Sequence, residues 1–196
     1  MIAIMDRLSR PAPYRRYAGD SVYVRPPEAG DWREWAELRA ESRSFLEPWE
    51  PIWAEDALTR ESYRRRRQRC LRDARGEEGY ALFVVRALDD ALLGGINVSN
   101  IVRGLRMSCS IGYWIGQRYA RNGYMTEAVR IILGFAFVEL RLQRVEAGCV
   151  PSNVASAGLL RNLGFREEGY ARKYLNINGQ WHDHRLFAIL ASDPRP

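Results

Sequence analysis

The chain carries the sequence IGYWIGQRYARNGYMTEA from Ile111 to Ala128. It begins as a strand, passes through a turn, and continues from Thr126 to Leu140 as an almost wholly apolar helix. The first N–H groups of such a helix lack intrahelical partners and lie at the positive end of its dipole, so they favour a pyrophosphate. Gly123 permits close backbone approach, while Arg118 and Arg121 can add charge-assisted hydrogen bonds. An ordinary surface turn shares this chemistry, so both interpretations stay open.

The turn also argues against two other kinds of phosphate site. It lacks the lysine and hydroxyl of a P-loop, and it has one glycine where a dinucleotide fingerprint has three. A kinase or a dehydrogenase is therefore disfavoured.

Around this stretch the apolar pattern predicts strands and helices in mixed order. Two strands precede it and, with the strand on which it begins, make three consecutive strands with short connections, which indicates an antiparallel meander; Asn178-Gly179 is a hairpin signal. The expected strands are 22–24, 80–87, 92–101, 107–115, 144–150, 170–177 and 181–190. The expected helices run from Asp31 to just before Pro48, over 57–74 and 126–140, and from the Asn153 cap to Leu163.

Composition indicates a single globular domain. The chain has 196 residues, 46% of them hydrophobic and 28% charged, with a mean hydropathy of −0.38. We expect residues 1–20 to be a loosely held extension, and the apolar run at Met1 is too short for a secretory signal. No apolar window is long enough to cross a membrane. Three cysteines cannot all pair and have no metal-ligand spacing, so we expect a cytoplasmic protein without a metal site.

The basic residues are almost all arginines. Lys173 is the single lysine among 30 basic residues, and the formal net charge is +6. Because arginine binds phosphate and carboxylate bidentately, a polyanionic partner is expected: a phosphorylated cofactor, an RNA-rich particle or an acidic peptide. A cluster on the second predicted helix is either a solvated face or an electrostatic surface for ribosomal RNA or an acidic protein; its members are Arg64, Arg65, Arg66, Arg67, Arg69 and Arg72.

Two segments resemble the GCN5-related N-acetyltransferases, the GNAT superfamily. In the acetyl-CoA pattern Gln/Arg-x-x-Gly-x-Gly/Ala, Arg118 takes the first position, Arg121 replaces the first glycine and Gly123 retains the second. The segment from Pro151 to Tyr170 resembles the strand-to-helix segment that follows in that family, in which an asparagine and a small residue contact the cofactor. Those positions are Asn153 and Ser156.

Within the superfamily the chain is most similar to the Rim type, and to RimJ in particular, which acetylates ribosomal-protein N-termini. The segments 45–51, 97–104 and 175–184 carry this resemblance, which extends over nearly the whole chain. It implies a mixed α+β (α/β) fold over residues 21–192. We expect a mostly antiparallel sheet of six or seven strands, splayed after the fourth strand, with helices on both faces.

The resemblance also implies which residues bind acetyl-CoA. The backbone at the end of the fourth strand should face the pantetheine arm, and the turn after it should hold the pyrophosphate. The residues concerned are Tyr113, Trp114, Ile115, Gln117, Arg118, Arg121, Asn122, Gly123, Tyr124, Met125, Thr126, Asn153 and Ser156.

The implied reaction is direct attack of an amine on the thioester. Because an α-amine has a pKa of about 7.7 to 8.0, a water relay suffices to deprotonate it. The Ile115 N–H is the expected oxyanion donor. Leu160 stands where much of the superfamily has an acidic tyrosine, which leaves Ser156 either as the proton donor or as a small cofactor contact. Leu175 stands where some Rim relatives have a glutamate base, so the base is unassigned.

Substrate-side residues follow from the same resemblance. Glu50 is the leading residue to hold or deprotonate the amine, with a solvated loop carboxylate as the alternative. Asn97 is expected to orient the peptide, and Trp49 either lines the mouth or belongs to the core. His182 and His184 share one side of the last strand, and a structural role is favoured for both.

Three functions remain open on these residues. The first is acetylation of a ribosomal protein's N-terminal alanine. The second is the same chemistry on a small-molecule amine or a lysine side chain. The third is a ribosome-assembly factor that retains the fold and docks through the arginine cluster.

Overall fold

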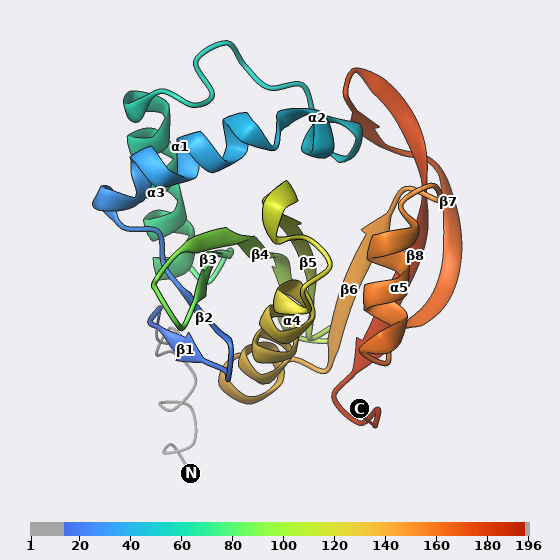
Figure 1. Cartoon of the computed structure of the whole chain (residues 1–196). Helices are drawn as coiled ribbons and strands as arrows, with labels where there is room; N and C mark the ends of the chain where they lie inside the picture. The colour runs from blue at the N-terminus through green and yellow to red at the C-terminus, as the bar shows by residue number, and fades with distance from the viewer. Residues whose placement is uncertain (1–13, 195–196) are drawn as a thin grey trace.

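The computed structural model describes residues 14–194 as strands and helices around one sheet (Figure 1). The strands are β1 (Tyr17–Ala18), β2 (Val22–Arg25), β3 (Tyr80–Arg86), β4 (Leu92–Val102), β5 (Ser108–Ile115), β6 (Arg144–Cys149), β7 (Arg166–Ile177) and β8 (Gln180–Leu190). The helices are α1 (Trp32–Glu41), α2 (Arg43–Leu46), α3 (Arg60–Arg75), α4 (Tyr124–Gly134) and α5 (Val154–Asn162). Shorter helical turns are η1 (Ala29–Asp31), η2 (Glu47–Trp49), η3 (Gln117–Tyr119) and the π-helical η4 (Phe135–Glu139).

The sheet has eight strands in the order β1-β2-β3-β4-β5-β6-β8-β7. Every neighbouring pair is antiparallel except β5 and β6, so the expected mixed, mostly antiparallel sheet is confirmed. Six or seven strands were expected, and the additional one is β1, which is only two residues long. It pairs with β2, so this part of the predicted N-terminal extension lies on the sheet. Residues 1–13, the rest of that extension, lie outside the described residues.

The sheet opens between β5 and β6. These strands pair only at Ser108, Cys109 and Ser110, opposite Arg144, Val145 and Glu146. From Ile111 to Ile115, β5 follows β4 alone, while β6 continues beside β8. The predicted splay is therefore present, and it divides the molecule into the two halves seen in Figure 1.

Helices cover both faces of the sheet. α4 and α5 bury the larger core, with Ile111 of β5 among its members. α1 and α3 bury a second core on the opposite face, which includes Trp114. The two residues are three positions apart, so alternation along the strand sends their side chains to opposite faces. A Cβ at Gly95 would lie 2.6 Å from the Trp114 Nε1, which explains why glycine stands there.

The first predicted helix is divided in two. It was expected to continue from Asp31 to just before Pro48, but it ends at Glu41 and resumes as α2. Ser42 at the junction is buried, and its Oγ accepts a hydrogen bond from the Gln117 N–H at 2.9 Å. This contact fixes the junction against the segment that follows β5.

Other boundaries differ by a few residues. Thr59 caps α3 through its hydroxyl, so that helix begins later than expected. β7 begins at Arg166, four positions before the expected residue 170. Across residues 14–194 no helix combines the length and apolarity needed to span a membrane. The cysteines of this part of the chain are free and buried.

Candidate functional site

The turn before α4 has the backbone conformation of an anion site. Gly123 at the N-cap has φ of +80°, and Arg121 has φ of +63°, both in the left-handed region. The Asn122 Nδ2 donates to the carbonyls of Tyr119 (3.2 Å) and Ala120 (3.0 Å), which closes the turn. No side chain caps the helix, and its first hydrogen bond joins the Glu127 N–H to the Gly123 carbonyl.

The N–H groups of the first turn of α4 therefore have no partner within the helix. Met125 is buried in the core and only its backbone can bind a ligand, whereas Tyr124 and Thr126 are half-buried. Together with the helix dipole, these donors form a site for phosphate groups.

The arginines of the turn differ in their contacts. Arg118 forms an exposed ion pair with Glu41 of α1 at 3.0 Å and stacks on the Tyr119 ring. An exposed pair contributes little to stability, so Arg118 can exchange Glu41 for a phosphate at small cost. Arg121 is exposed, and no ion pair is found for it among residues 14–194.

The open edge of β5 carries unpaired backbone groups. The Gly116 N–H donates to the Leu93 carbonyl at 2.8 Å, and every second residue before it likewise faces β4. The residues between them, Ile111, Tyr113 and Ile115, therefore direct their N–H and C=O groups towards β6, beyond the last β5–β6 pair. An extended ligand can pair with this edge as a strand would. The Trp114 side chain is in the second core, so only its backbone is available.

One side-chain contact crosses the opening. The Tyr113 hydroxyl on β5 lies 2.9 Å from the Ser156 Oγ on α5. Burial raises the pKa of Tyr113 to about 12, despite the opposing hydrogen bond to Ser156. The phenol is therefore neutral at physiological pH and keeps a proton to donate. The alternation of β5 indicates the direction of Tyr113, but no pattern in the sequence indicates its partner.

Ser156 is held by the cap of its own helix. The Asn153 Oδ1 accepts a hydrogen bond from the Ser156 N–H at 3.0 Å. The Asn153 backbone is also in use, since its N–H donates to the Val150 carbonyl and its carbonyl accepts from the Ala157 N–H, so the side-chain Nδ2 is the group left for a ligand. Leu160, one turn further, is fully buried. The structure thus has no proton donor at the position where much of the superfamily has tyrosine, in agreement with the sequence.

Glu50 is bound to other residues of the chain. Arg39 of α1 donates to both carboxylate oxygens, and the Trp53 Nε1 donates to Oε2 at 2.8 Å. The Arg39 guanidinium also lies over the Trp114 ring, 4.8 Å from its centroid. Sequence patterns did not indicate Arg39. Since the carboxylate is already satisfied by two donors, this geometry favours a positioning role for Glu50 over proton abstraction.

The loop around Glu50 reaches the β7–β8 hairpin. The Asn178 N–H donates to the Glu50 carbonyl at 2.9 Å. Trp49 is half-buried, and Asn97 of β4 is half-buried beside Gly112 of β5. Gly112 is exposed, and a Cβ built on it would meet nothing within 4 Å, so this part of the sheet is open to solvent.

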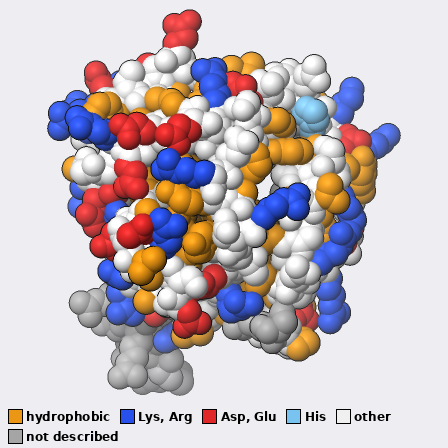
Figure 2. Space-filling view, in the orientation of Figure 1, with side chains coloured by type: hydrophobic (Ala, Val, Ile, Leu, Met, Phe, Trp, Pro, Cys, Tyr) orange, Lys and Arg blue, Asp and Glu red, His pale blue; other side chains and the backbone are white. Residues whose placement is uncertain are grey.

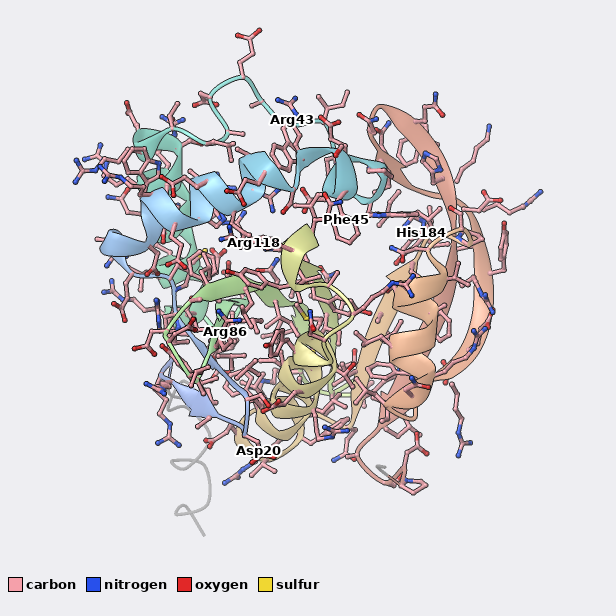
Figure 3. All side chains as sticks on the ribbon, in the orientation of Figure 1. Asp20, Arg43, Phe45, Arg86, Arg118 and His184 are labelled. Atoms are coloured by element: carbon pink, nitrogen blue, oxygen red, sulfur yellow. The ribbon has the colours of Figure 1, made fainter. Side chains whose placement is uncertain are left out.

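The two histidines lie on the far side of the opening. His184 is buried, its Nδ1 lies 3.1 Å from the His182 carbonyl, and its ring packs against Tyr174. Figure 3 shows Phe45 of α2 and His184 of β8 on opposite sides of the opening, and Figure 2 shows the surface hollowed there. No group of three or more His, Cys, Asp or Glu side chains is placed to hold a metal within residues 14–194.

Comparison with known proteins agrees with this geometry. The family model described as an acetyltransferase (GNAT) domain matches residues 21–166. The chain is 40% identical over 175 residues to "Probable N-acetyltransferase YjcK" of Bacillus subtilis, which covers 89% of this chain and 97% of the relative. It is 33% identical over 184 residues to the [ribosomal protein uS5]-alanine N-acetyltransferase of Escherichia coli, a match that covers 94% of this chain and 95% of the relative.

Solved structures give the same result. The ribosomal-protein-S5-alanine acetyltransferase of Vibrio fischeri superposes with a TM-score of 0.84 at 30% identity, covering 92% of this chain and 99% of that one. RimJ of Mycobacterium smegmatis in complex with CoA-disulfide superposes with a TM-score of 0.83 at 32% identity, covering 90% of this chain and 85% of that one. The donors of α4 and the open edge of β5 suit the pyrophosphate and amide groups of coenzyme A. The chain thus belongs to the GNAT acetyltransferase family, with RimJ/RimL-type relatives, and is an acetyl-CoA-dependent N-acetyltransferase.

Proposed function

We propose that this enzyme acetylates the N-terminal α-amine of a protein, namely the N-terminal alanine of a ribosomal protein. The observation that carries the proposal is the 33% identity, over 94% of the chain, to a relative named for that reaction on uS5. The open edge of β5 beside α4 supports it, since that edge can accept an extended thioester. A ribosomal substrate also implies a cytoplasmic location.

Acetyl-CoA supplies the acetyl group as a thioester, and the chain's own groups orient it and move protons. The pKa of an α-amine is about 7.7 to 8.0, so roughly a tenth or more of the acceptor is neutral at pH 7. A water relay then suffices as base, in keeping with the exposed Leu175 where some relatives have a glutamate. The Ile115 N–H donates to the thioester oxygen as negative charge develops on it.

Ser156 protonates the departing sulfur in this proposal. Tyr113 donates its hydroxyl hydrogen to the Ser156 Oγ, so the serine's own hydrogen is free to point at the sulfur. As Ser156 gives its proton to the sulfur it takes the phenolic proton of Tyr113, and the proton released by the acceptor amine returns to the phenolate through water, so Tyr113 acts through Ser156.

The acceptor is identified by the mass of the product. Purified ribosomal proteins, polyamines and lysine-containing peptides are each incubated with labelled acetyl-CoA. We expect one added acetyl group on a defined protein N-terminus that begins with alanine. Label confined to small amines or to lysine side chains would contradict the proposal. A peptide with the sequence of that N-terminus, but with proline in place of the alanine, is the negative control and should not be acetylated.

Loss of the Ser156 hydroxyl is expected to lower kcat about a hundredfold, the contribution of one general acid. Tyr113→Phe is expected to lower kcat about tenfold, and the double variant should be no slower than Ser156→Ala, because Tyr113 acts through the serine. KM for acetyl-CoA should change little. The measurements are steady-state rates, with Ser152→Ala and Tyr170→Phe as matched controls of unchanged rate. If the losses in kcat of the two single variants instead multiply in the double variant, Tyr113 does not act through Ser156.

Docking on the ribosome is a second proposal, supported by three exposed arginines of α3. Arg65 pairs with Asp56, and the Arg67 Nε donates to the Pro27 carbonyl. No ion pair is found within residues 14–194 for the other four members, which are exposed: Arg64, Arg66, Arg69 and Arg72; of these, Arg64, Arg69 and Arg72 lie on the outward side of the helix.

Replacing these three arginines together by glutamine should weaken cosedimentation with ribosomes at low salt and leave peptide acetylation unchanged. Binding should fall steeply with salt, because each phosphate contact releases counterions. A matched triple variant at exposed positions elsewhere, Arg130, Arg141 and Arg172, should bind normally. Equal loss in both triple variants would show that only net charge matters.

A further inference from the structure

Two arginines of the α3 cluster, Arg66 and Arg67, have their Cα atoms on the inner side of the helix, and Arg67 is already used there, since its Nε donates to the Pro27 carbonyl. Tyr63, Cys70 and Ala74 mark this face, since all three are buried against the sheet. Arg66 is three positions after Tyr63 and four before Cys70, which places it on the same face. It therefore differs from the outward members of the cluster.

Arg66 lies beside the residues that hold Glu50. Its guanidinium is 6.0 Å from the Trp35 ring centroid, and that of Arg39 is 5.8 Å from the same ring. Arg39 is paired with Glu50, so these two charges cancel. Arg66 has no ion pair within the part of the chain that the structure describes. The three side chains Arg39, Glu50 and Arg66 therefore carry a net charge of one positive unit.

The Arg66 side chain has other groups of the chain around it and is also reached by solvent. Burial lowers the pKa of its guanidinium, and the nearby Arg39 cation lowers it further against the opposing effect of Glu50. Even so, Arg66 is exposed to solvent, which is compatible with a crowded but open position. The sheet on this face also has solvent access at Gly112, beside Asn97.

These features identify what Arg66 can bind. An arginine fork binds a carboxylate bidentately, and a cation with no counter-charge among its neighbours is stabilised by one. The same cation repels the protonated amine of an acceptor. An acceptor that carries a negative charge of its own therefore binds more tightly. The nearby carboxylate, Glu50, is already held by Arg39 and Trp53.

We propose that Arg66 binds a carboxylate of the acceptor, contributed by an acidic side chain within the first few residues of the acetylated N-terminus. This rests on the proposed function, because it assumes a protein N-terminus as acceptor. It separates Arg66 from the other arginines of α3: Arg66 selects the acceptor sequence, and the outward arginines face solvent.

The test compares three matched pairs of peptides that begin with alanine; the members of a pair differ only by Glu or Gln, at the second, third or fourth residue. The wild-type enzyme is expected to prefer Glu at one of these positions by about tenfold in kcat/KM, equivalent to about 1.4 kcal/mol. Arg66→Gln should remove the preference by lowering kcat/KM for the Glu peptide alone. Arg66→Glu should favour a Lys peptide instead. Arg69→Gln is the control and should retain the preference.

Two results would overturn the proposal. One is equal kcat/KM for the Glu and Gln peptides with wild-type enzyme; the other is an equal loss on both peptides in Arg66→Gln. Acetylation of free glutamate in preference to either peptide would assign the carboxylate to a small acceptor and also contradict it. Absence of acetylation on every peptide would instead refute the proposed function, so the two failures are distinguishable.

Discussion

The separation of β5 from β6 after Ser110 is the constraint on which the rest of the molecule depends. A buried strand edge must satisfy its N–H and C=O groups, and leaving such groups without partners costs free energy. Here three consecutive edge positions, from Ile111 to Ile115, face an opening that water and ligand can enter. The opening therefore supplies donors and acceptors in the fixed spacing of a strand.

The surrounding structure keeps this edge open and rigid. On one side, α4 is packed into the larger core, so its N-terminal donors are fixed beside the end of β5. On the other, the Tyr113–Ser156 contact links β5 to α5 where the strands no longer pair. At the mouth, the Arg39–Glu50 pair and the Asn178–Glu50 backbone bond join α1 and the β7–β8 hairpin. In the proposed mechanism, phosphate binding, proton delivery and acceptor selection therefore fall to different elements around one gap.

Much of this arrangement could be predicted from the sequence. The apolar helix after a glycine turn indicated the donors of α4, and alternation in 107–115 gave the strand whose edge is open. Arg121 stands where the family pattern has glycine, and it still adopts the left-handed conformation that glycine favours. Local conformation is encoded in neighbouring residues, so these features could be predicted from the sequence.

The partners of individual side chains could not be predicted in this way. The Glu50 carboxylate, expected at the substrate mouth, is satisfied by Arg39, which is eleven positions away on a helix face that carried no signal. The α3 arginines formed a single cluster in the sequence, yet their positions around the helix divide them between its outward and inward sides. Such pairings depend on how elements pack, which composition and periodicity do not specify.

Hydrogen exchange measured residue by residue, with and without acetyl-CoA, tests the open edge most directly. The account predicts slower exchange on binding at the N–H groups of Ile111, Tyr113, Ile115 and the first turn of α4, and little change along α3. Unchanged exchange at these positions in a saturated complex, or protection confined to another part of the sheet, would contradict it.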